Sequence, residues 1–186
     1  MFDDNRSKTI IVVAHCLLNQ NSISDGTADF PSQFRALIDL IMTHNIGLIQ
    51  LPCPELTCLG LDRQDRLGGT RPLLQENSRI RNLLSEPGNV EQLRHKAEEV
   101  AAHLQEYDSY GFKILGVVGI NRSPSCGVET TSEDGHEVAG QGVFMELLAE
   151  ALQRRGQTLK MVGVKTSESQ ESVRKLQQLI EESREI

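Results

Sequence analysis

Four cysteines are the residues of this chain whose type and spacing point most directly to chemistry: Cys16, Cys53, Cys58 and Cys126. Three of them stand in polar or proline-containing segments, HCLLNQNS, PCPE and SPSCG, rather than inside apolar runs. An isolated cysteine is usually a small buried hydrophobe. Three thiols that meet would instead bind a soft metal, either Zn²⁺ with water as the fourth ligand or an iron–sulfur cluster with one open iron. No Cys-x-x-Cys pair is present to choose between these two centres.

Polar side chains beside the thiols add acid–base chemistry. Glu55 follows Cys53 with only Pro54 between them, so a carboxylate is held near the expected metal by a stiffened backbone and is a candidate general acid or base. Ser123 and Ser125 precede Cys126 in a turn-forming segment, and their hydroxyls and backbone N–H groups suit a polar ligand. The alternatives are an ordinary exposed loop acid or a helix N-terminal charge at Glu55, and a serine-rich turn leading into Gly127 at 123–126.

The elements that must position these side chains form an α/β pattern. Apolar runs at residues 9–14, 47–51, 112–120 and 159–164 lack alternation, which is typical of strands buried on both faces of a parallel sheet. Helical periodicity lies between them, at residues 34–41, 90–104 and 143–152. The pattern predicts one three-layer domain over residues 1–186, with a mostly parallel sheet flanked by helices. Cys16, Cys53 and Cys126 follow three of these strands and are expected to meet at the carboxyl edge.

Two further segments carry expectations of their own. Residues 57–88 are rich in glycine, proline and arginine and are interpreted as a long, less regular excursion over the sheet edge or the mouth of the site, with a short helix at 80–84. Ser167 with Gln170 resembles a capping box that opens a last helix, whose solvated face is the glutamate-rich tail from 168 to 186.

Composition excludes several classes of partner. The 186 residues include 26 acidic and 19 basic side chains, a net charge of −7, which argues against duplex nucleic acid or anionic lipid. Aromatic residues make up only 4%, with no tryptophan, too few to stack single strands. No apolar run approaches the ~18 residues that span a bilayer. The first six residues, MFDDNR, lack the layout of a secretory signal, so the expected location is cytoplasmic and the expected partner a small molecule.

Taken together, the segments Cys16-Leu17-Leu18 with Asp25-Gly26, Cys53-Pro54-Glu55, and Ser123-Pro124-Ser125-Cys126-Gly127, with VAGQGV at 138–143, resemble the thiouracil desulfidase family. The resemblance implies a 4Fe-4S cluster on Cys16, Cys53 and Cys126, whose fourth iron binds the sulfur of a thiolated nucleobase before water replaces that sulfur. It also implies that Glu55 is the acid/base and Ser123 a polar helper, and we assign Ser125 and Asp25 to substrate binding.

The sequence departs from the family at residues 19–24, NQNSIS, where better-known members have an arginine and an aromatic residue. The expected substrate is therefore a thiolated nucleobase or a related small thio-compound. Two alternatives stay open: an electron carrier or sensor with Cys58 as fourth cluster ligand, and a zinc-dependent hydrolase on the same three cysteines.

Overall fold

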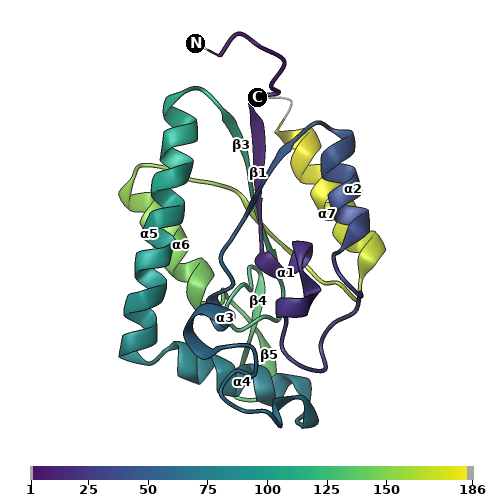
Figure 1. The fold of residues 1–186 in the computed structure, drawn as a ribbon, viewed down its shortest axis with the longest axis vertical. Helices are drawn as coiled ribbons and strands as arrows, with labels where there is room; N and C mark the ends of the chain where they lie inside the picture. Colours follow the sequence, from purple (N-terminus) through teal and green to yellow (C-terminus); the bar gives the residue numbers. More distant parts are fainter. Residues whose placement is uncertain (1, 184–186) are drawn as a thin grey trace.

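A parallel sheet of four strands forms the centre of the protein, as a computed structural model of residues 2–183 describes it (Figure 1). The strands are β1 (Thr9–Val13), β2 (Gly47–Gln50), β3 (Lys113–Ile120) and β6 (Met161–Val164), in the spatial order β2-β1-β3-β6. Every pairing is parallel. β1 and β3 are the inner strands and are almost wholly buried, which explains their continuous apolar sequences. The four expected strands and their parallel arrangement are confirmed.

Helices cover both faces of the sheet and give the α/β fold its three layers (Figure 1). On one face lie α5 (Pro87–Ser109) and α6 (Val143–Arg154), which pack against each other. The other face carries α2 (Arg35–Thr43) and α7 (Ser169–Glu182). The apolar stripes that predicted these helices point into the core, for example Leu93, Ala97 and Leu104 of α5, all fully buried.

The remaining elements gather around the carboxyl ends of the strands (Figure 1). They are α1 (His15–Leu18), the 3₁₀ turn η1 (Gln20–Ser22), α3 (Pro54–Leu59), the 3₁₀ turn η2 (Gly68–Thr70), α4 (Leu73–Leu84), and an antiparallel hairpin of β4 (Thr130–Glu133) and β5 (His136–Ala139). This end of the molecule is therefore built from short elements, whereas the long helices lie along the faces of the sheet.

The interpretation of residues 57–88 as a mostly irregular excursion was wrong. α4 spans twelve residues in place of the short helix expected at 80–84. Its buried face carries the polar residues Glu76, Asn77 and Ser78 before the apolar Ile80 and Leu84, so apolar periodicity marks only the second half of the helix. Hydrogen bonds to the hairpin hold this face instead: Asn77 donates to the Ser132 hydroxyl, and the Gly135 N–H donates to Ser78.

The expected capping box at Ser167 was also wrong. The last helix begins at Ser169 after Glu168, and no side chain caps its first turn. Ser172 instead ties the helix to the preceding strand, because its hydroxyl accepts from the Lys165 N–H and donates to the Lys165 carbonyl. The end of the predicted tail, 184–186, lies outside the described residues. No helix within residues 2–183 combines the length and apolarity that a bilayer crossing requires.

Candidate active site

A cavity of about 180 Å³ lies where the strands of the sheet end. Its walls include the segments that follow all four strands. These are His15 and Cys16 after β1, Cys53 to Glu55 after β2, residues 120–126 at the end of β3, and Thr166 after β6. The chain leaves β1 toward β2 on one side and returns to β3 on the other side of β1. Such a reversal of strand order opens a crevice at the carboxyl edge, which is the usual ligand site of an open α/β sheet.

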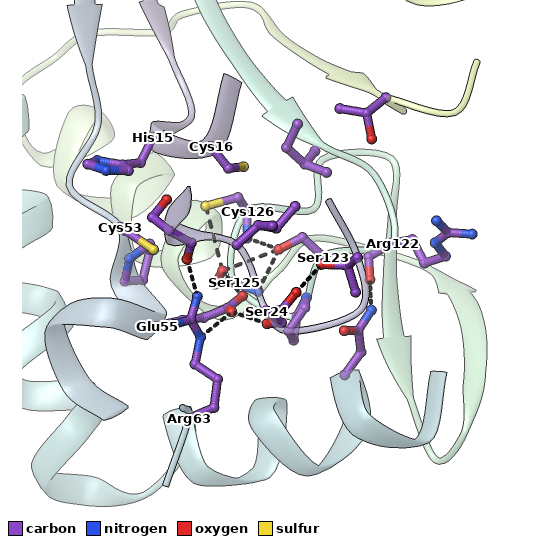
Figure 2. A pocket seen from close by; sticks show the side chains of 18 of the residues that line it. His15, Cys16, Ser24, Cys53, Glu55, Arg63, Arg122, Ser123, Ser125 and Cys126 are labelled. Carbon is purple, nitrogen blue, oxygen red and sulfur yellow. Dashed lines mark hydrogen bonds and ion pairs between the residues drawn. The ribbon is translucent and has the colours of Figure 1, made fainter. Parts of the chain in front are cut away.

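Three of the four thiols line this one cavity, and Figure 2 shows the side chains of Cys16, Cys53 and Cys126 turned toward a common space. Cys16 stands in α1, directly after β1. Cys53 is the N-cap of α3, where its Sγ accepts a 3.5 Å hydrogen bond from the Leu56 N–H. Pro54 occupies the first turn of this helix, where its missing N–H costs nothing. The expected convergence of the three segments at one edge of the sheet is therefore what the structure shows.

The turn that carries Cys126 is fixed by its own serine. The Ser123 hydroxyl accepts from the backbone N–H groups of Ser125 and Cys126, at 3.3 and 3.0 Å. Two glycines let neighbouring backbone come close: a Cβ at Gly119 would collide with the Cys126 carbonyl oxygen, and one at Gly142 with the Ser125 carbonyl group. Cys126 is 5% exposed, so its place is set by close backbone packing.

Burial is the main influence on the pKa values of the three thiols. Burial, followed by the charges of Cys53 and Glu55, raises the pKa of Cys16 to about 12. Burial and the other two thiols raise the pKa of Cys126 well above its usual range, and burial and then Glu55 raise that of Cys53. Because the thiolate is the form that ligates metals, binding at this site must release protons.

In the part of the chain that the structure describes, no three or more histidine, cysteine or acidic side chains are arranged to hold a metal ion. The three thiols share a cavity without forming a closed shell around one point. Cys58 does not line this cavity. Its Sγ lies 4.0 Å from the Asn89 carbonyl oxygen, and burial, followed by the charge of Cys53, raises its pKa.

Glu55 is the buried carboxylate of the cavity wall, 7% exposed, and three side chains donate to it (Figure 2). Its Oε2 accepts from the Ser24 hydroxyl and from Arg63 Nε, both at 3.0 Å. Its Oε1 accepts from the Ser125 hydroxyl at 2.8 Å. A buried charge is stable only when it is paired and hydrogen-bonded, and this carboxylate has both kinds of partner.

The two predicted serines form a chain of hydroxyls that ends on Glu55. Ser123 Oγ and Ser125 Oγ lie 3.2 Å apart, and Ser125 in turn contacts Glu55 Oε1 and lies 3.6 Å from Cys126 Sγ. The arrangement joins a half-buried hydroxyl, a fully buried hydroxyl and a carboxylate beside a thiol, which suits proton transfer.

Asp25 is placed differently from the other predicted site residues. It is exposed and does not line the thiol cavity, whereas its neighbours Ser24 and Gly26 do. Asp25 lies in an adjoining hollow, and its carboxylate faces the backbone of Gly69. The Asp25-Gly26 pair acts here as a turn, with Gly26 at a φ of +77°, so the assignment of Asp25 to substrate binding finds no support in its position.

Sequence reasoning missed Ser24 and Arg63 as partners of Glu55. Arg63 stands among several arginines of one segment, and nothing in its local sequence separates it from Arg66 or Arg71. Its burial depends on the path of the 60–72 loop, which only the folded chain defines.

Comparison with known proteins gives one relative for this arrangement. Over 123 residues the chain is 30% identical to a protein of Methanocaldococcus jannaschii described as "Uncharacterized protein MJ0003". The match covers 66% of this chain and 70% of the archaeal protein. The chain belongs to the MJ0003 family. No protein-family model matches the sequence, and no solved structure matches it. Membership of the MJ0003 family does not indicate an activity, so the function is argued from the residues of the cavity.

Proposed function

We propose that this protein is a desulfidase that depends on a 4Fe-4S cluster and replaces the sulfur of a thiolated nucleobase, or of a related small thio-compound, with oxygen. The observation that carries the proposal is the meeting of Cys16, Cys53 and Cys126 in one cavity beside the anchored Glu55 carboxylate. The likeness of the three cysteine segments to thiouracil desulfidases supports the same reaction.

The donor set is one that a cluster uses. Soft thiolates are the usual protein ligands of iron–sulfur clusters, and a four-iron cluster held by three of them keeps one iron open. The Leu56 N–H, which donates to the sulfur of Cys53, is a hydrogen-bond donor of the kind that stabilises cluster thiolates.

When bound, the cluster would supply an open soft Lewis acid for the sulfur of the substrate, which makes the carbon of the C=S bond electrophilic. The net reaction joins C=S and water to give C=O and hydrogen sulfide, without oxidation or reduction. Glu55 Oε1 accepts the proton of the attacking water, and the hydroxyls of Ser125 and Ser123 extend that path toward the substrate. Burial of the carboxylate keeps bulk water away from it.

The decisive experiment is anaerobic reconstitution followed by a sulfide-release assay on 2-thiouracil, 4-thiouracil and a panel of thiolated nucleosides and small thioamides. The wild-type protein should hold iron and acid-labile sulfide and release sulfide. Glu55→Gln keeps the shape of the side chain and should lower kcat about 10²–10⁴-fold with its iron content unchanged. A protein loaded with iron that releases no sulfide from the whole panel would overturn the proposal.

Cysteine substitutions test the ligand set. Cys16→Ser, Cys53→Ser and Cys126→Ser should each lose iron and labile sulfide after reconstitution. Cys58→Ser is the matched control and should keep both, because its side chain faces Asn89 rather than the cavity. Loss of the cluster in Cys58→Ser would favour an electron carrier with four cysteine ligands, and stoichiometric zinc without iron would favour a zinc-dependent hydrolase.

A further inference from the structure

Arg63 is the most deeply buried charged side chain of the cavity wall, 2% exposed. It donates four hydrogen bonds: Nε to Glu55 at 3.0 Å, Nη1 to the carbonyls of Gly60 and Leu61 at 2.8 and 3.1 Å, and Nη2 to the carbonyl of Ser22 at 2.5 Å. The guanidinium thus joins α3, the loop after it and η1 at one point. Figure 2 shows Arg63 beside Glu55.

The backbone at Arg63 is held in a conformation that side chains rarely adopt. Its φ is +52°, and that of the next residue, Gln64, is +63°. Left-handed backbone at a long side chain costs free energy and persists where surrounding contacts enforce it. Here those contacts are the hydrogen bonds of the guanidinium, so the loop is bent in the way that brings Arg63 to Glu55.

Anchoring by Arg63 makes the two oxygens of Glu55 different. Oε2 is occupied by Arg63 and Ser24, whereas Oε1 faces only the Ser125 hydroxyl. Lysine would reproduce this anchoring only in part, because its ammonium is a compact point charge and lacks the planar fork that reaches acceptors on two sides.

The positive charge also lies beside the thiols. Arg63 lines the same cavity as Cys16, Cys53 and Cys126, and its buried guanidinium is hydrogen-bonded to Glu55, which follows Cys53 by two residues. The other arginine of the cavity wall, Arg122, is only half-buried, and in Figure 2 its guanidinium points away from the thiols.

We propose that Arg63 is a positioning residue of this site: its buried guanidinium fixes Glu55 so that Oε1 faces the serine chain, and its charge offsets that of the carboxylate and the three ligating thiolates. The positioning of Glu55 by Arg63 rests on the proposed desulfidase function. The effect of the Arg63 charge on the site requires only that a cluster is bound, so the two roles can be tested separately.

The test compares Arg63→Lys, Arg63→Met and the control Arg66→Met, which lies in the same loop with its side chain 93% exposed. With the reconstituted proteins, Arg63→Met should lose about 100-fold in kcat while KM stays within about threefold, because substrate contacts remain but Glu55 is no longer held. Arg63→Lys should recover part of that kcat, and Arg66→Met should match the wild type.

A second readout does not depend on turnover. The reduction potential of the bound cluster should become more negative in Arg63→Met, because a nearby positive charge is lost, and should stay near the wild-type value in Arg63→Lys and Arg66→Met. If Arg63→Met leaves the cluster or the fold damaged, the pair Glu55→Gln/Arg63→Met removes both charges together and should restore the melting temperature toward the wild type.

The outcomes separate the two proposals. Sulfide release with unchanged kcat and potential in Arg63→Met would overturn the role of Arg63 and leave the desulfidase function standing. If the wild type releases no sulfide but the reduction potential is shifted in Arg63→Met, the role of the Arg63 charge stands. The desulfidase reaction is then overturned, and with it the positioning of Glu55 for that reaction. A wild-type protein that binds no iron would overturn both.

Discussion

Two ion pairs of this protein use the same chemical groups in opposite surroundings. Glu55 and Arg63 meet at 3.0 Å with their side chains 9% and 2% exposed. Glu98 of α5 and Arg154 of α6 meet at 2.6 Å on the surface, with 36% and 48% exposed. The surface pair is the shorter, yet solvent screens it, and it forms among side chains that must give up conformational freedom. Distance alone is therefore a poor guide to what an ion pair does.

The buried pair differs in what depends on it. Each of its members has further partners that are also buried, so removing one leaves a charge without compensation. The surface pair is one link in a mesh that includes Arg155 and Glu150, and water replaces any lost partner. One pair positions a carboxylate, and the other joins two helices whose apolar faces already pack.

The largest expected effect sharpens this contrast in stability. Glu55→Leu should lower the free energy of unfolding of the metal-free protein by about 3–5 kcal/mol, because it leaves the Arg63 guanidinium buried and unpaired. Glu98→Leu should cause a far smaller loss, since its partners stay hydrated. Urea denaturation of both variants measures the difference, and equal losses would contradict the distinction between the pairs.

A smaller effect is expected from Ser125, the donor to the Oε1 atom of the buried carboxylate. Ser125→Ala should cost about 1–3 kcal/mol of unfolding free energy, because the bond that its hydroxyl donates to Glu55 Oε1 is lost. Ser109→Ala is the matched control, with an exposed hydroxyl that donates to the Glu106 carbonyl. If the two alanine variants unfold at the same urea concentration, the Ser125 bond contributes nothing to the anchoring.

The smallest effect concerns acid and salt at the surface pair. The Arg154 guanidinium lowers the pKa of Glu98 below its ordinary 4.5. A depressed pKa in the folded state means that the stabilisation is full above about pH 4.5 and is lost as pH falls through the folded value. Glu98→Gln should therefore flatten the fall in melting temperature below pH 4.5, and 1 M salt should weaken the pair in the wild type. An unchanged acid limb in Glu98→Gln would show that the pair is not formed in solution.

Much of the frame could be read from the sequence because its signals are local. The four strands are continuous apolar runs, and Cys16, Cys53 and Cys126 follow three of them, so a parallel sheet brings the thiols to one edge. The hairpin of β4 and β5 was missed although Asp134-Gly135 is a strong turn signal, with both residues at positive φ. The two strands are short and mostly polar, so no apolar pattern indicated them in the sequence.

The parts that escaped prediction depend on contacts between distant segments. The first half of α4 buries polar residues against the hairpin, so an apolar count finds only the end of this helix. Arg63 lies eight residues from Glu55 in sequence but also contacts Ser22, 41 residues earlier. Asp25 stands in a motif segment, yet the turn it forms faces another hollow. Such pairings follow from the loop path, which composition and spacing do not define.

The three thiols of the cavity come from segments that are 37 and 73 positions apart along the chain. Closely spaced cysteines can capture a metal while a chain is still being synthesised, but these three are together only after β3 has paired with β1. With the proposed cluster, maturation of the protein would therefore follow a fixed order, in which the polypeptide folds first and is loaded afterwards. Anything that binds only the finished site then draws the population toward the folded state by mass action, so supply of the ligand would govern how much of the protein accumulates in a cell.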